Sequence, residues 1–253
     1  MVDFDFRTAQ SRATPKTHEV DQGLRSYMLR VYNYMGSALC LTGIVALAIF
    51  NMSVSGFAPT GQPILTNLGV TLYSSPLQWV VMLSPLAIVI YMSFGMAKMS
   101  SSKAQTLFWI FAALMGASLS SILLVYTGLS ITRVFFITAI TFGAMSIYGY
   151  TTKKDLTGWG SFLFMGLIGI IIASLVNLFL QSPAMYFVIS IIGVLIFVGL
   201  TAYDTQKIKN MYLVSDSGEI MGKKAVMGAI ALYLDFIKLL IMLLRCVGYA
   251  DLR

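Results

Sequence analysis

Seven long apolar segments dominate this 253-residue chain and set what it can fold into. A segment of about 20 predominantly apolar residues is long enough to cross the hydrocarbon core of a bilayer as an α-helix. Only 11% of the residues are charged and the mean hydropathy is +0.82, whereas about a quarter of the residues in a soluble domain are charged. The sequence therefore predicts an all-α membrane protein with most of its surface facing lipid.

The polar turns between the apolar runs predict where each helix begins and ends. Residues 1–25 are expected to form a polar cytoplasmic N-terminal tail, disordered or interfacial, and residues 26–253 a transmembrane domain. Residues 52–76 predict a polar external loop with a short interfacial segment at 64–72. No stretch alternates with a period of two for ten residues, so every element is predicted to be helical. The expected helices are 31–51, 77–97, 104–126, 131–150, 159–180, 184–205 and 225–248.

The distribution of lysine and arginine predicts the orientation. These residues concentrate in the N-terminal tail and in the loops after the second, fourth and sixth helices, and such loops face the cytoplasm. We therefore expect a cytoplasmic N-terminus and seven crossings. The net charge of +7 gives a pI near 9.4, but the basic residues lie in short loops rather than on one face, so nucleic-acid binding is not expected.

Small and sulfur-containing residues point to packing rather than to chemistry. Gly36, Cys40 and Gly43 form a small-residue stripe that predicts close helix packing. Cys40 and Cys246 do not form a disulfide framework or a zinc pattern. The single histidine, His18, lies in the polar tail, which excludes a histidine-based site inside the membrane. No cofactor is expected.

Two acidic residues, Asp204 and Asp235, lie within or at the rim of the last two apolar runs. A carboxylate in hydrocarbon costs several kcal/mol unless it is paired, protonated or hydrated. Helical spacing places Asp204 on one stripe with Ser190, Gly193, Phe197 and Thr201, and Asp235 on another with Gly228, Ala231, Lys238, Met242 and Arg245. If the stripes face each other, the two carboxyls cannot readily both ionise, and one shared proton would hold the helices together. Loss of that proton would open the contact and leave an anionic site that attracts calcium.

A simpler interpretation of the two aspartates stays open. Lys207 follows Asp204 by three residues and Lys238 follows Asp235 by three, so each aspartate could neutralise its own lysine. The expected helix ends also put Asp235 about 10 Å deeper than Asp204 at 1.5 Å per residue. Pairing therefore requires the sixth helix to extend past residue 205 or the seventh to begin before 225.

These stretches resemble the bacterial branch of the Bax inhibitor-1 family, from about residue 25 to the end of the chain. The resemblance is carried by the seven-helix layout, by the Asp204–Lys209 end of the sixth helix, and by the run Ala231–Ile237. It implies six helices around a central seventh, and a pH-sensitive calcium leak channel of the bacterial inner membrane, gated by Asp204 and Asp235. Similar proteins carry an arginine near the end of the second helix. Here Lys98 is the basic residue of that stretch, and a lysine lacks the bidentate fork of arginine.

An intramembrane protease and a membrane adaptor are the two alternatives to a channel. Intramembrane aspartyl proteases combine Tyr-Asp with Gly-x-Gly-Asp, and Tyr203–Asp204 matches the first motif while Leu232–Asp235 lacks the glycine of the second. We therefore do not expect an enzyme. The alternative is a membrane adaptor that modulates a membrane protease or another membrane protein, with no ion path. Asp204 and Asp235 are thus the candidate gate and calcium site, with Lys98, Lys207 and Lys238 as candidate supporting charges.

Overall fold

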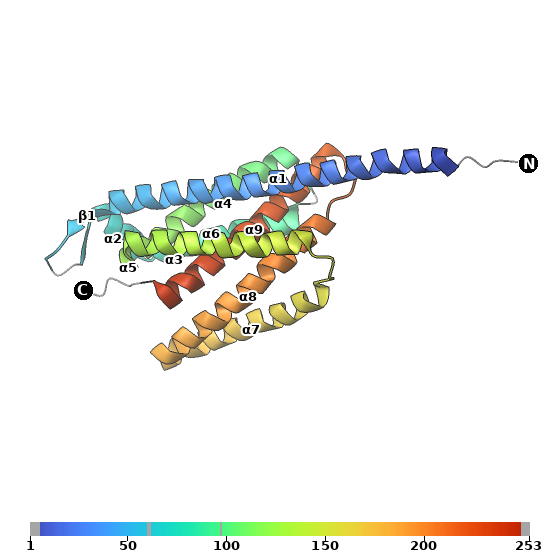
Figure 1. The fold of residues 1–253 in the computed structure, drawn as a ribbon. Coiled ribbons are helices and arrows are strands. Elements are labelled where there is room, and N and C mark those ends of the chain that lie inside the picture. Colours follow the sequence, from blue (N-terminus) through green and yellow to red (C-terminus); the bar gives the residue numbers. More distant parts are fainter. Residues whose placement is uncertain (1–5, 60–61, 97, 249–253) are drawn as a thin grey trace, which may run out of the picture.

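The computed structural model describes residues 6–59, 62–96 and 98–248, with side chains from residue 22 onward. Within this part of the chain, helices form one elongated bundle, with the start of α1 and the end of α9 toward opposite ends (Figure 1). In chain order the elements are α1 Phe6–Ser53, β1 Val54–Phe57, β2 Pro63–Leu65, α2 Asn67–Ser74, α3 Leu77–Gly95, α4 Ser101–Leu119, α5 Ile122–Val125, α6 Gly128–Thr151, α7 Thr157–Leu180, α8 Pro183–Asn210 and α9 Gly218–Val247.

Seven segments of the described chain are long and apolar enough to cross a membrane, which confirms the predicted multi-pass helical architecture. Each of them coincides with one expected apolar run. The third segment, Ser101–Val125, is not one straight helix, because α4 ends at Leu119 and α5 follows after Ser120. The Ser120 hydroxyl donates to the Ala117 carbonyl (2.6 Å) and accepts from Tyr73 of α2 (2.8 Å), which fastens this break to a neighbouring helix.

Helix ends differ from the prediction at both ends of the chain. The first helix begins at Phe6, although residues 1–25 were expected to be a disordered or interfacial tail. α8 continues to Asn210 and α9 begins at Gly218, so the helices reach into the basic stretch interpreted as a loop. The lysines there are compatible with helix because their amines find partners. Lys209 donates to the Tyr150 carbonyl (2.7 Å), and Lys224 donates to the Met211 carbonyl (2.8 Å) and Asp216 (2.6 Å).

The loop between the first two crossings contains the described strands, which the all-helical prediction missed. β1 and β2 form a short antiparallel hairpin, with Val54 opposite Leu65 and Phe57 opposite Pro63. α2 then begins after Thr66, whose hydroxyl accepts from the Gly69 amide (3.2 Å). Strands of three and four residues are too short to show a periodic pattern in sequence.

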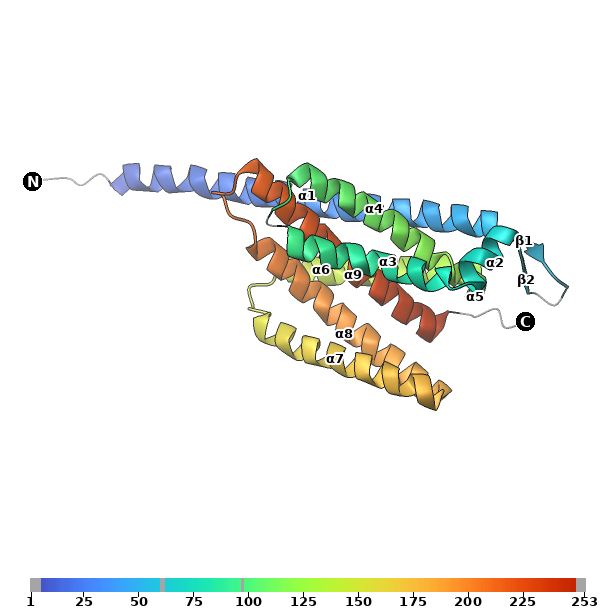
Figure 2. The same cartoon turned by 180° about the vertical axis from the view of Figure 1, so that it is seen from behind.

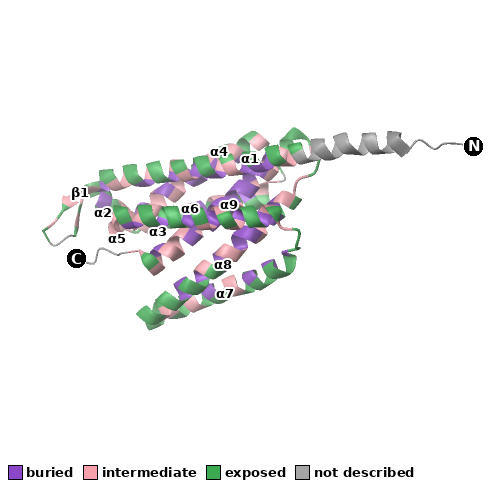
Figure 3. Cartoon of the chain, in the orientation of Figure 1, coloured by how far each residue is buried: buried purple, intermediate pink, exposed green. Residues whose placement is uncertain are grey.

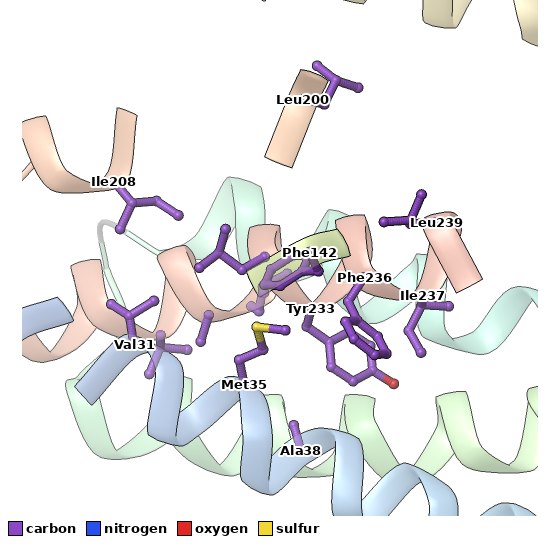
Figure 4. Close-up of a cluster of buried hydrophobic side chains, with 14 of the residues drawn as sticks. Val31, Met35, Ala38, Phe142, Leu200, Ile208, Tyr233, Phe236, Ile237 and Leu239 are labelled. Atoms are coloured by element: carbon purple, nitrogen blue, oxygen red, sulfur yellow. The ribbon is translucent and has the colours of Figure 1, made fainter. Parts of the chain in front are cut away.

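α9 is the central helix, as the family resemblance implied. Of its most apolar 18-residue window, 61% is buried, against 11–39% for the other six crossings. α1, α4, α6 and α8 all pack against it (Figure 2), and buried positions run along most of its length (Figure 3). Its side chains Tyr233, Phe236 and Ile237 lie toward α1 and Phe142 of α6 in the core, whereas Leu239 points to the other side of α9 (Figure 4). α7 lies at the edge of the bundle and packs mainly on α8.

The predicted close packing of Gly36, Cys40 and Gly43 is wrong. Side chains added to Gly36 or Gly43 would meet no atom within 4 Å, and Cys40 is exposed. α1 packs through a different face, which carries the buried Val31 and Ala38. The predicted stripe therefore lies off the packed face of α1.

Candidate functional site

The two stripes predicted on α8 and α9 face each other. On the side toward the α8–α9 connection, a Cβ on Gly228 would lie 3.0 Å from Ile208 of α8. On the opposite side, a Cβ on Gly193 would lie 2.9 Å from the Met242 sulfur. Glycine thus allows close approach on both sides of the segment that contains the two aspartates. These two contacts set the register of α8 against α9 and bring Asp204 next to Asp235, so the depth difference that the predicted helix ends had implied is absent.

The carboxyls of Asp204 and Asp235 lie between these two close approaches. Asp235 is only 4% exposed, and its Oδ2 atom is buried with no hydrogen-bond partner among the described residues. Asp204 is half-buried on α8 and acts on Asp235 both by its charge and through a side-chain hydrogen bond. Two carboxyls can share a hydrogen bond only when one of them carries a proton. The arrangement can therefore hold or release a proton at a helix–helix contact.

The three candidate lysines do not neutralise the aspartates directly. The ion pairs in the described part of the chain are Lys223–Glu219 (3.4 Å) and Lys224–Asp216 (2.6 Å). Lys238 is half-buried, lies 5.6 Å from the centre of the Phe197 ring, and reaches Asp235 only through its longer-range charge.

Lys207 and Lys98 are both exposed. Lys98 lies in the turn between α3 and α4, and within the described chain it forms no ion pair with either aspartate. Among the candidate charges, Lys238 is therefore the one placed to influence the carboxyl pair.

A chain of hydroxyl groups beside the pair was not found from the sequence. Ser146 of α6 bonds to Tyr32 of α1 and, at 3.0 Å, to Thr205 of α8. Thr205 is the neighbour of Asp204 and is fully buried. The next residue along α8 is Gln206. Its side-chain oxygen accepts a hydrogen bond from the backbone N–H of Leu156, and its side-chain nitrogen donates one to the Lys154 carbonyl, both at 2.8 Å. Single hydroxyl and amide side chains give no sequence pattern, so only the fold shows that they hold this end of α8.

A second polar contact fixes α9 on its other side. The Thr42 hydroxyl of α1 donates to the Ala112 carbonyl of α4 (2.8 Å) and is 2.7 Å from the Tyr233 hydroxyl of α9. Since Thr42 has one proton to donate and gives it to Ala112, Tyr233 donates to Thr42. Tyr233 is fully buried, so this hydroxyl has no access to water.

Thr42→Val is expected to destabilise the bundle by about 1 kcal/mol, because it leaves the buried Tyr233 hydroxyl without an acceptor. Thr138→Val is the matched control, since Thr138 is also buried but its hydroxyl donates to the Val134 carbonyl of its own helix (2.8 Å). Thermal unfolding of both variants in detergent measures the difference. An equal loss of stability in the two variants would contradict the bridging role of Thr42.

The far end of α9 carries a cation in aromatic surroundings. Arg245 lies 5.2 Å from the centre of the Tyr186 ring of α8, and Tyr186 bonds to Tyr126. Burial and the neighbouring Tyr186 raise the pKa of Tyr126 above its ordinary value of 10.0. Tyr126 therefore remains neutral over the neutral pH range and does not titrate with the carboxyls.

The described residues hold no group of three or more His, Cys, Asp or Glu side chains that could form a metal cage. Calcium takes six to eight oxygen ligands in a stable site. Two carboxyls supply fewer oxygen atoms, so the pair is not by itself a complete calcium site.

The fold and the site define a multi-pass, predominantly helical membrane protein with two carboxyls at the contact of α8 and α9. The family model described as "Inhibitor of apoptosis-promoting Bax1" matches residues 24–251. A Rickettsia prowazekii protein is 46% identical over 248 residues, covering 98% of both chains. The inner membrane protein YbhL of Escherichia coli is 45% identical over 229 residues, covering 89% of this chain and 92% of its own. The chain belongs to the Bax inhibitor-1 family, which confirms the resemblance found in the sequence.

Proposed function

We propose that the chain is a calcium, or more broadly cation, leak channel that opens as pH rises, with Asp204 and Asp235 as its gate. The observation that carries this proposal is the Asp235 carboxyl, which is 4% exposed, has one unpartnered oxygen and faces a second carboxyl. Ionisable groups inside a membrane are costly and are retained where they serve transport or proton transfer.

Protonation gives the gate its direction. With one proton shared, the two carboxyls attract, and α8 stays against α9. When that proton leaves, two negative charges face each other in a medium of low dielectric constant and repel. The charged groups that act on Asp235 are Asp204 from α8 and Lys238 from α9 itself. A rise in pH therefore favours separation of the helices, and a fall in pH favours contact.

Buried hydroxyls on α8 provide oxygen atoms along the proposed path. Ser190, Thr201 and Thr205 are all fully buried on this helix. Ser190 and Thr201 donate to carbonyls of their own helix at 2.8 Å, which leaves lone pairs of their oxygens free. Hard cations prefer such oxygen ligands, so a calcium ion that leaves the carboxyl pair would meet further ligands on the same helix.

The bacterial inner membrane is the proposed location, because the similar Escherichia coli protein is named for that membrane. The lysine and arginine distribution supports a cytoplasmic N-terminus. The α8–α9 connection would then face the cytoplasm, and Arg245 would lie near the outer face.

Calcium entry into proteoliposomes tests the proposal. A calcium-sensitive dye is enclosed, the external pH is stepped from acid to alkaline, and protein-free liposomes serve as the blank. We expect a protein-dependent flux that rises with pH. Absence of flux at every pH would overturn the channel, and would favour an adaptor that acts on a membrane protease.

Lys238→Gln is expected to move the rise in flux to higher pH, because it removes the positive charge that favours ionisation of Asp235. Lys98→Gln is the control and is expected to leave the profile unchanged, since Lys98 is exposed and within the described chain pairs with neither aspartate. The same flux assay measures both. A larger shift for Lys98→Gln than for Lys238→Gln would contradict this expectation. It would indicate that Lys98 takes the place of the arginine that similar proteins carry near the end of the second helix.

A further inference from the structure

Two cavities line the seam between α1 and α6, which make little direct contact with each other. The larger, of 580 Å³, lies toward the N-terminal end of the membrane-spanning part of α1, and the smaller, of 310 Å³, toward the opposite end. Phe236 of α9 borders both cavities. Its ring packs on the ring of Phe142 of α6, with the two ring centres 5.5 Å apart (Figure 4). Both volumes fall in the range of ligand-binding pockets, about 300–1,000 Å³.

Glycines keep this seam open rather than closing it. Within membranes glycine usually lets two helix backbones approach each other. Here a side chain built on any of four seam glycines would find open space within 4 Å. These are Gly36 and Gly43 on α1, and Gly128 and Gly143 on α6. The two walls therefore lack side chains at these four positions, and the space there is available to a flexible apolar chain.

A positive charge marks one end of the larger cavity. Arg25 lines it three residues after the start of the membrane-spanning segment, is exposed, and forms no ion pair within the described chain. Tyr150 lies on the opposite wall. The Lys209 amine is 5.2 Å from the centre of the Tyr150 ring and donates a hydrogen bond to the Tyr150 carbonyl (2.7 Å). The remaining walls are mainly apolar, and the exposed Leu29 and Ile147 continue them outward to the lipid-facing surface.

We propose that the larger cavity between α1 and α6 binds one acyl chain of an anionic phospholipid, whose phosphate is held by Arg25. A lipid is the occupant because the cavity opens sideways from the bundle among exposed apolar side chains. An anionic headgroup follows from charge complementarity with an arginine at the edge of the membrane.

The same cavity reaches the hydroxyl chain beside the aspartates. Tyr32 and Ser146 line it, and Ser146 bonds to Thr205, the neighbour of Asp204. A bound acyl chain therefore contacts groups that hold α8 in place. The lipid site does not depend on ion conduction, so it is tested by measuring lipid binding alone.

Spin-labelled phosphatidylglycerol and phosphatidylcholine, each added as a trace to phosphatidylcholine bilayers containing the full chain, measure the association directly. We expect the native protein to immobilise phosphatidylglycerol about fivefold more strongly, the effect of one basic residue at the membrane surface. Arg25→Gln should reduce this preference to near unity. Gly143→Leu should lower the immobilised fraction of both lipids, because the leucine fills the cavity without a clash.

Two control variants separate the site from the general lipid surface. Arg30→Gln removes an exposed arginine of α1 that lines a different pocket, and Gly169→Leu adds a leucine to the exposed face of α7. Both should behave as the native protein. Equal association of the two native headgroups would overturn the proposal, as would losses in the controls that match those of Arg25→Gln and Gly143→Leu. Size-exclusion profiles confirm that each variant is folded.

Discussion

Asp235→Asn is expected to flatten the pH dependence of calcium flux, with the flux held at its low, acid-side level up to alkaline pH. An asparagine cannot ionise, so the repulsion that separates α8 from α9 does not develop. Its amide also donates a hydrogen bond to the Asp204 carboxylate, which preserves the contact at every pH. Asp204→Asn should act in the same way with the roles exchanged, and the double variant should be no flatter than either single one. Flux into proteoliposomes over the pH series measures all three.

Asp155→Asn is the matched control for these variants. Asp155 is an exposed aspartate between α6 and α7, and it accepts hydrogen bonds from the Thr157 amide (2.9 Å) and hydroxyl (2.6 Å). Those bonds lower the pKa of Asp155, so it stays ionised through the neutral range and should not contribute to the profile. An asparagine keeps the acceptor oxygen. A native-like pH profile in Asp204→Asn and Asp235→Asn would retain the channel and reject the gate.

Gly149→Leu is expected to unfold or strongly destabilise the protein. Gly149 of α6 lies against the backbone of Ala202 in α8, so that a Cβ at this position would lie 2.2 Å from the Ala202 oxygen. Backbone atoms cannot move aside as a side-chain tip does, and the two helices would have to separate two residues away from Asp204. Overpacking costs about 1–3 kcal/mol or more, which corresponds to a fall in Tm on the order of 10 °C.

Gly143→Leu on the same helix is the control for this effect. A Cβ on Gly143 would meet no atom within 4 Å, so the same substitution two turns earlier should leave the Tm near its native value. Thermal unfolding in detergent compares the two variants. Equal Tm values would show that α6 and α8 are not in the backbone contact described here.

The seven crossings and the family could be predicted from the sequence because apolar length is a strong signal. The ends of α8 and α9 could not be predicted, because charged residues such as Lys209 and Lys224 are typical of loops. Only the fold shows the hydrogen bonds that their amines donate, to Tyr150 from Lys209 and to Met211 and Asp216 from Lys224. The helix ends alone do not decide the pairing of Asp204 with Asp235, because the register of α8 against α9 brings the two residues together.

The packing of α1 was predicted wrongly for a related reason. A small-residue stripe indicates that a helix can be approached closely, but the partner decides whether it is. Gly36 and Gly43 remain uncovered, while Gly149 of α6, which belonged to no predicted stripe, lies against a backbone. The two aspartates were found because charge inside an apolar run is conspicuous in sequence. Thr205 and Ser146 were not, because hydroxyls are common in helices of every kind.

The most buried helix of the bundle, α9, follows the helices that surround it in the order of the chain. α1, α4, α6 and α8 are synthesised before α9, yet each of them packs against it. Until α9 is inserted, Thr42 lacks its Tyr233 partner and Asp204 lacks its Asp235 partner. A chain truncated before Gly218 would therefore be left with polar groups exposed to lipid at its centre, which should make it a substrate for proteolytic quality control. Assembly of this core thus waits until α9 has been translated and inserted.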